Sequence, residues 1–107
     1  MQKGFNPQQM MKQLQQLQAR MAEAQRVIDE TVVEGSAGGG AVKVTMTAKP
    51  QLESIAIQPD VLDAEDVEML QDLITAAVNE ALEKVREVQS SQMSGLTGGI
   101  NIPGLTP

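Results

Sequence analysis

Reactive and aromatic side chains are the most informative absences in this sequence. Among its 107 residues there is no cysteine, histidine, tryptophan or tyrosine, and there is a single phenylalanine. Without cysteine the chain has no disulfide, thiolate metal ligand or thiol nucleophile. Without histidine it lacks the commonest general base and metal ligand. The near-absence of aromatic rings argues against gripping single strands by base stacking. We therefore predict no enzyme, no metal and no cofactor.

Long apolar runs are also missing. No segment approaches the roughly 18 consecutive apolar residues that a membrane-spanning helix needs. Residues 1–16 lack the apolar stretch of a signal peptide. These observations predict a cytoplasmic protein with no membrane partner, and nothing in the sequence predicts a small-molecule substrate.

Positive charge is scarce, because the formal net charge is −6. Residues 1–26 hold four basic side chains and one acidic one, whereas the rest of the chain holds four basic and thirteen acidic ones. Generic affinity for nucleic acid usually comes from a basic surface. The overall balance disfavours such affinity, and the beginning of the chain is the place where a cationic patch is expected.

Residues 7–30 are predicted to form a long helix. Asn6 suits the N-cap position and Pro7 suits the first turn. Apolar side chains then recur at alternating steps of four and three, which is the spacing of a heptad seam: Met10, Leu14, Leu17, Met21, Ala24 and Ile28. The stripe is narrow and glutamine surrounds it, which is typical of a helix that pairs with another helix and projects from its domain.

The chain then changes to a period of two. Three short strands joined by short connections predict an antiparallel meander, and they cover 31–34, 42–47 and 55–57, with a turn at 49–51. The fold is therefore expected to place a three-stranded sheet between two helices.

A second long helix is predicted from about 64 to 89, with Asp63 as its N-cap. Its apolar face is broader than that of the first helix, so we expect deeper packing. The acidic residues at its start fit a helix N-terminus better than a cation site, because no calcium-loop pattern is present. From residue 90 onward glycine, serine, proline and threonine dominate, which predicts a flexible tail. The predicted organisation is α+β, α-β-β-β-α, with one domain over 1–89 and a tail over 90–107.

Four glycines within 35–40 give the composition of a phosphate-binding loop. A P-loop requires a lysine after its last glycine and then a helix, whereas Gly40 precedes Ala41 and a predicted strand. The dinucleotide pattern also fails, since its third glycine position is Lys43. A hairpin connection is the favoured interpretation, with a local anion-binding nest of backbone N–H groups as the alternative.

One polar face of the first helix holds Lys12, Gln16 and Arg20, which lie four residues apart. Lysine and arginine contact phosphates, and glutamine bonds base edges or backbone. This face has two interpretations, a surface that contacts DNA and an ordinary solvated helix surface.

Five segments of the chain carry a resemblance: "MMKQLQQLQARMAEAQ" at 10–25, "VEGSAGGGAVKVTM" at 33–46, "IQPDVL" at 57–62, "LQDLITAAVNEALEKV" at 70–85 and "TGGINIPG" at 97–104. Together, and in this order, they resemble the YbaB/EbfC family of bacterial nucleoid-associated proteins. The resemblance implies a small homodimer with projecting helices that binds duplex DNA in the nucleoid, with roles in nucleoid organisation and gene regulation. It makes Lys12 and Arg20 candidate DNA contacts, with Gln16 beside them, and adds Lys3 and Arg26.

Two questions stay open at the level of the sequence. The dimer surface is either the helix seam, comprising Met10, Leu14, Leu17, Met21 and Ile28, or the edges of the sheet. The rival function is a protein-interaction module that docks a partner through this seam or through the acidic second helix. A nucleotide-binding regulator that uses the loop Gly35–Gly40 is a third interpretation.

Overall fold

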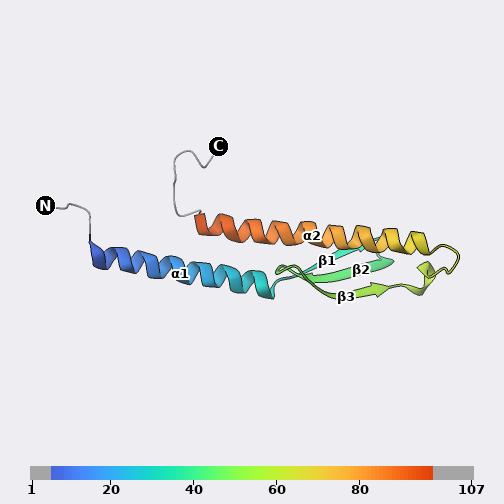
Figure 1. The fold of residues 1–107 in the computed structure, drawn as a ribbon, viewed down its shortest axis with the longest axis horizontal. Coiled ribbons are helices and arrows are strands. Elements are labelled where there is room, and N and C mark those ends of the chain that lie inside the picture. Colours follow the sequence, from blue (N-terminus) through green and yellow to red (C-terminus); the bar gives the residue numbers. More distant parts are fainter. Residues whose placement is uncertain (1–5, 98–107) are drawn as a thin grey trace, which may run out of the picture.

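A computed structural model describes residues 6–97, which form two long antiparallel helices and a three-stranded sheet in an elongated molecule of 80 × 28 × 16 Å (Figure 1). The elements are α1 (Pro7–Glu30), β1 (Val32–Ala37), β2 (Val42–Thr47), β3 (Gln51–Ile57), the 3-10 turn η1 (Pro59–Val61) and α2 (Val67–Thr97). The sheet is antiparallel with strand order β1-β2-β3. The predicted α-β-β-β-α order is therefore confirmed.

Helix α1 begins and ends where its sequence predicts. The Asn6 side chain accepts hydrogen bonds from the backbone N–H groups of Gln8 and Gln9, at 3.0 and 3.4 Å. At the other end the Thr31 N–H and hydroxyl both donate to the Val27 carbonyl. Ala24 is the one buried residue of α1. The helix therefore packs against the rest of the molecule along one side only, and its two caps satisfy backbone groups at its ends.

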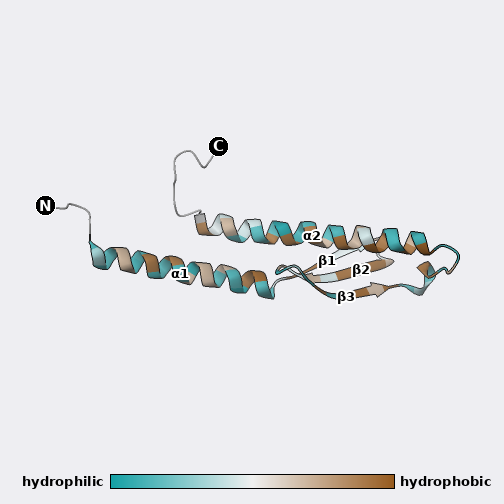
Figure 2. Cartoon of the chain, viewed as in Figure 1, coloured by the Kyte–Doolittle hydropathy of each residue, from teal (hydrophilic) through white to brown (hydrophobic). Residues whose placement is uncertain are grey.

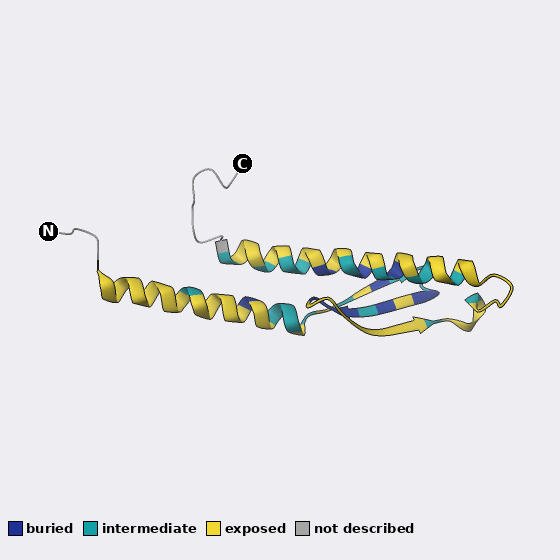
Figure 3. Cartoon of the chain, viewed as in Figure 1, coloured by how far each residue is buried: buried dark blue, intermediate teal, exposed yellow. Residues whose placement is uncertain are grey.

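The core lies between the sheet and α2. Val42 and Val44 of β2 are completely buried, as are Ala77 and Ala81 of α2, and Val85 extends the same cluster. Figure 3 shows this buried layer between β2 and α2, while β3 and most of α1 are exposed. The deeper packing predicted for the second helix is confirmed.

Gly35 allows β1 to approach α2 closely. A Cβ atom at this position would lie 2.1 Å from the Ala77 carbonyl oxygen and 2.5 Å from the Ala81 backbone nitrogen. No side chain fits that space, because backbone atoms of the helix already occupy it. The small residues Ala77 and Ala81 complete the contact on the helix side.

The remaining glycines of the motif form the β1–β2 turn. Gly38, Gly39 and Gly40 have φ angles of 66°, 67° and 95°, in the region that favours glycine. Strand β2 follows directly, and no helix begins there. The hairpin interpretation is confirmed, which removes the helix that a P-loop requires.

The two edges of the sheet differ. On the free edge of β1, the Lys84 ammonium donates to the Glu34 carbonyl at 2.6 Å. The Glu80 carboxylate accepts from the Ser36 N–H at 3.3 Å. Side chains of α2 therefore cover this edge. Within residues 6–97, no strand pairs with the outer edge of β3.

Several predicted boundaries are wrong. Strand β1 extends to Ala37 rather than residue 34, and β3 begins at Gln51 rather than 55. Pairing with the central strand orders both segments despite their weak alternation: Gly35 pairs with Val44, and Gln51 with Thr47.

Helix α2 begins and ends later than predicted. Asp66, not Asp63, caps it, because the Asp66 carboxylate accepts from the Met69 N–H at 3.2 Å. Asp63 instead closes a turn, accepting from the Glu65 N–H at 2.9 Å. The helix ends at Thr97 rather than 89, because its last turns lie beside α1 and tertiary contact overrides weak propensity. The other residues of the expected tail, 98–107, lie outside the described residues, as does Lys3.

Candidate nucleic-acid interface

The first half of α1 projects beyond the rest of the molecule. The end of α2 lies beside residues 19–24 of α1, and together they line a cleft of about 380 Å³, whose residues are Ala19, Arg20, Glu23, Ala24, Gln92, Gly95 and Leu96. Residues 7–18 extend past this point (Figure 1) and, apart from the half-buried Leu17, are exposed. A straight, exposed helix of this kind presents its side chains to a large partner without obstruction.

Lys12 and Gln16 of the predicted polar face lie on this projecting part, whereas Arg20 lies just beyond it and lines the cleft with α2. Lys12, Gln16 and Arg20 are exposed and follow one another at one-turn intervals. Among residues 6–97, no hydrogen bond or ion pair engages the side chain of Lys12 or Arg20. Two cations that pair with no described side chain are therefore available to phosphate oxygens.

Lys12 has a polar surrounding that the sequence pattern did not single out. Asn6, Gln8 and Gln9 line an open hollow of about 440 Å³ together with Lys12. The N-cap brings Asn6 and the first-turn glutamines to the side of Lys12, which lies one turn further along the helix. Amide side chains beside a lysine suit contacts to a sugar-phosphate backbone.

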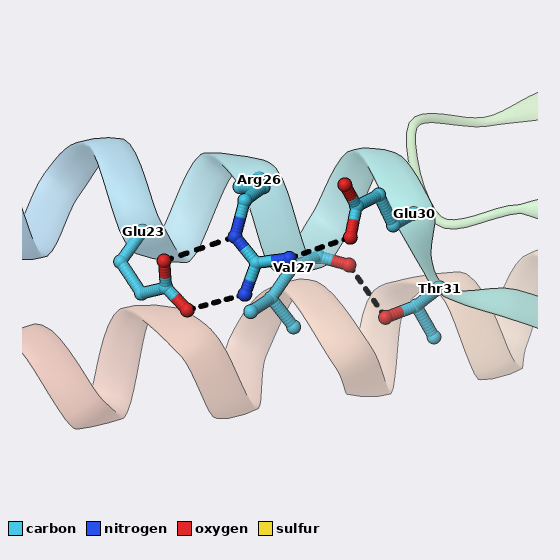
Figure 4. A network of polar contacts seen from close by, with 5 residues as sticks. All are labelled: Glu23, Arg26, Val27, Glu30 and Thr31. Atoms are coloured by element: carbon cyan, nitrogen blue, oxygen red, sulfur yellow. Dashed lines mark hydrogen bonds and ion pairs between the residues drawn. The ribbon is translucent and has the colours of Figure 1, made fainter.

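Arg26 differs from the two cations that precede it. Its guanidinium Nε donates to Glu23 at 3.0 Å, and a second nitrogen donates to Glu30 at 2.6 Å, as Figure 4 shows. The hydrogen bond from Arg26 lowers the pKa of the Glu23 carboxyl. The same bond, with the charge of Glu23, raises the pKa of Arg26. Two carboxylates thus compensate the charge of Arg26, although all three side chains are exposed.

Acidic side chains are absent from the projecting part. In α1 they begin at Glu23, and the acidic start of α2 lies at the opposite end of the molecule (Figure 1). The longest dimension is 80 Å, whereas the Debye length is about 10 Å at 0.1 M salt. The net negative charge therefore repels a polyanion weakly at the tip of α1.

The heptad seam of α1 is covered by α2 only in part, at Ala24, which is buried and lines the cleft with α2. Met10, Leu14 and Met21 are each more than half exposed, at 53%, 56% and 53%. Leu17 and Ile28 are partly buried. Beside Ala24, helix α2 meets the adjoining side of α1, where Val27 and the C-cap residue Thr31 line a shared hollow with Val88, Ser91 and Gln92. Figure 2 shows hydrophobic residues recurring along α1, including its projecting part. The role of the seam in dimerisation stays a prediction.

A second apolar surface, on β3, was not identified from the sequence. Leu52 and Ile55 are 47% and 39% exposed. Ile55 pairs with Val44 of the buried face of β2, so both side chains lie on the α2 side of the sheet. Helix α2 covers β1 and β2 and leaves this margin open. This surface is exposed because β3 is an edge strand, and the sequence alone does not give the strand order.

Two further observations concern residues 6–97. They contain no group of three acidic side chains placed to hold a metal ion. Neither α1 nor α2 is long and apolar enough to cross a membrane.

Comparison with known proteins connects this geometry to a family. A family model described as the YbaB/EbfC DNA-binding family matches residues 2–100. A nucleoid-associated protein of Alkaliphilus metalliredigens is 54% identical over 96 residues, covering 90% of this chain and 84% of that protein. A nucleoid-associated protein of Pelotomaculum thermopropionicum is 51% identical over 102 residues, covering 95% and 97%.

The fold also has a solved counterpart. The crystal structure of an uncharacterized protein, HP0035, from Helicobacter pylori superposes with a TM-score of 0.73. The identity is 21%, and the match covers 88% of this chain and 99% of the other. This likeness supports the fold alone.

Proposed function

The chain belongs to the YbaB/EbfC DNA-binding family, and on that premise we propose that it is a cytoplasmic, nucleoid-associated protein that binds duplex DNA as a homodimer. We further propose that it contributes to nucleoid organisation and gene regulation. Its relatives are named nucleoid-associated proteins, and the family is one of DNA-binding proteins rather than of enzymes.

The availability of Lys12 and Arg20 is the observation that carries this proposal. Both cations lie on one face of an exposed helix, and no described acidic side chain pairs with either. In the proposed mechanism they contact backbone phosphates, and Gln16 between them bonds the backbone or a base edge. Arg26 contributes less, because Glu23 and Glu30 hold its guanidinium.

The open edge of β3 supports the proposal of a homodimer. An exposed edge strand with unpaired backbone groups pairs readily with another chain. Here the exposed Leu52 and Ile55 add apolar surface beside that edge. The opposite edge is blocked by Glu80 and Lys84. We therefore place the partner subunit at β3, which leaves both copies of α1 free to contact DNA.

Fluorescence anisotropy of a labelled mixed-sequence duplex tests the function. The protein is titrated into the duplex at about 50 and about 200 mM salt. We expect binding at the lower concentration that weakens at the higher one, because released counterions drive phosphate contacts. Absence of binding at the lower concentration contradicts the proposal.

A protein-interaction module is the second candidate function. The exposed seam of Met10, Leu14 and Met21 is the observation that favours it. A protein partner captured through this seam, together with no affinity for the duplex, supports this second function over the first.

A further inference from the structure

The projecting half of α1 carries an apolar surface that nothing described covers. Pro7, Met10, Met11 and Leu14 line a hollow of about 300 Å³. Met10, Met11 and Leu14 are 53%, 63% and 56% exposed. The half-buried Leu17 continues the surface toward α2. We call these five residues the α1 apolar face. Contiguous apolar side chains on an exposed helix indicate a docking surface.

Helix α2 ends beside α1, on a side that adjoins this face. It runs antiparallel to α1 (Figure 1). Gly95 and Leu96 near its end line a cleft with Ala19 and Ala24. Continuing in that direction leads toward the N-terminal end of α1. Residues 98–107, which lie outside the described residues, start from this point.

Ten residues are long enough to reach the whole face. An extended chain of this length spans up to about 33 Å. The distance along α1 from Ala19 back to Met10 is about 14 Å, at 1.5 Å per residue. Crossing a third of the way around a helix of this diameter adds about 10 Å. The segment therefore reaches the α1 apolar face with length to spare.

The composition of the segment matches the surface. Residues 98–107 contain no charged side chain, and they include Ile100, Ile102 and Leu105. In an extended chain Ile100 and Ile102 point to the same side, because successive side chains alternate. Leu105 lies an odd number of residues further on, and Gly104 before it permits the change of direction that brings Leu105 to that side. Gly98 and Gly99 permit a change of direction directly after α2. Methionine is unbranched and adapts to such irregular ligands.

We propose that residues 98–107 dock along the α1 apolar face of the same chain, with Ile100, Ile102 and Leu105 against Met10, Met11 and Leu14. A tether of this length gives an effective concentration in the millimolar range, so a small contact is sufficient. A second copy of α1 lacks that advantage, and the face spans only a few helical turns. The docked segment shields apolar surface next to Lys12. This inference does not depend on DNA binding.

Paramagnetic relaxation of methionine methyl groups tests the proposal in the full chain. The chain has no cysteine, so Thr106→Cys provides a single site for a nitroxide label. We expect the methyl signals of Met10 and Met11 to lose most of their intensity. The Met69 signal, from the other end of α2, is the internal control and stays unchanged. Full intensity for Met10 and Met11 overturns the proposal.

An isotope-mixed sample identifies which chain supplies the segment. Spin-labelled chains without isotope are mixed with methyl-labelled chains that lack the nitroxide. We expect no loss of intensity in the mixture. Loss of the Met10 and Met11 signals there assigns the segment to a second copy and overturns docking within one chain.

A matched pair of variants tests the apolar contact itself. Ile102→Ser with Leu105→Ser, in the labelled chain, removes two of the three apolar side chains, and we expect the Met10 and Met11 signals to recover. Asn101→Ser is the control, because it changes a neighbouring polar residue, and the signals stay broadened. Broadening that persists in the double variant contradicts the proposed contact.

Discussion

At the scale of single residues, the glycines of the motif have two different roles. Gly35 lies within a strand and lets β1 contact the backbone of α2, whereas Gly38, Gly39 and Gly40 adopt positive φ angles in a turn. The same residue type therefore permits a close contact between β1 and α2 at Gly35 and a turn at Gly38–Gly40. These two adjacent requirements explain why residues 35–40 are as rich in glycine as a nucleotide-binding loop.

Gly35→Ala is expected to destabilise the fold. Its Cβ would meet the Ala77 carbonyl at 2.1 Å, so α2 must move away from β1, and overpacking of this kind costs about 1–3 kcal/mol or more. Urea unfolding followed by circular dichroism measures the change. Gly95→Ala is the control, because its Cβ meets nothing within 4 Å and alanine stabilises a helix by about 1 kcal/mol. Equal stability of the Gly35→Ala variant and the natural chain contradicts the clash.

The pair Glu23–Arg26 is expected to stabilise α1 in a pH-dependent way. The hydrogen bond from Arg26 lowers the pKa of Glu23 from its ordinary value of 4.5. The contribution is complete above that ordinary value and is lost as the pH falls through the lowered pKa in the folded chain. Thermal unfolding of the Glu23→Gln variant should therefore show a small deficit at neutral pH that disappears in acid.

Glu83→Gln serves as its control, since Glu83 is exposed and has no described ion pair. A deficit of the Glu23→Gln variant that persists unchanged in acid would show that the Arg26 contact does not cause it.

At the scale of elements, the sequence predicts best where local signals and tertiary contacts agree. Asn6, Pro7 and the heptad spacing place α1 correctly because its caps are local. The predicted end of α2 was wrong. Ser90, Ser91 and Gly95 are weak helix formers, and contact with α1 keeps this segment helical. Helix propensities take no account of that tertiary contact.

The candidate site was predicted in part. The spacing of Lys12, Gln16 and Arg20 identifies their common face, since helical periodicity alone decides it. The pairing of Arg26 with two carboxylates depends on side-chain positions. The sequence alone therefore did not separate Arg26 from the unpaired candidates Lys12 and Arg20. The open margin of β3 depends on strand order and on which strands α2 covers, and neither follows from a local pattern.

The margin of β3 is expected to control self-association. Ile55→Lys places a charge on this exposed apolar surface, where the proposed partner would bury it at a cost. We expect sedimentation equilibrium to show monomers for this variant and dimers for the natural chain, with unchanged circular dichroism. Ser54→Lys is the control, because Ser54 pairs with Thr45 and faces the other side of the sheet. A dimeric Ile55→Lys variant would move the interface elsewhere, with the α1 seam as the next surface to test.

At the scale of the whole molecule, charge and shape are arranged along the same axis. Lys12 lies near the tip of α1 and Arg20 lies where α2 ends beside it, while the acidic start of α2 lies at the far end of an 80 Å molecule. A protein with a net charge of −6 thereby has a cationic end, which is where we propose that DNA binds. The arrangement predicts binding that depends on few contacts.

The salt dependence of DNA binding is expected to be shallow. The slope of log affinity against log salt concentration reports the number of neutralised phosphates, at about 0.9 per phosphate for duplex DNA. Two cations per chain predict a slope well below that of proteins making about 6–10 phosphate contacts. Anisotropy titrations over a series of salt concentrations measure it. A slope in that steeper range would require cations that the proposed face does not contain.

Charge reversal on α1 tests whether this helix contacts DNA. DNA affinity of the double variant Lys12→Glu with Arg20→Glu is measured at low salt against Lys49→Glu with Arg86→Glu, which changes the net charge equally away from the projecting helix. We expect the α1 variant to lose about tenfold or more in affinity, since phosphate contacts are removed. We also expect the control variant to bind nearly as well as the natural chain. Equal affinities for the two variants would contradict the assignment of DNA binding to α1.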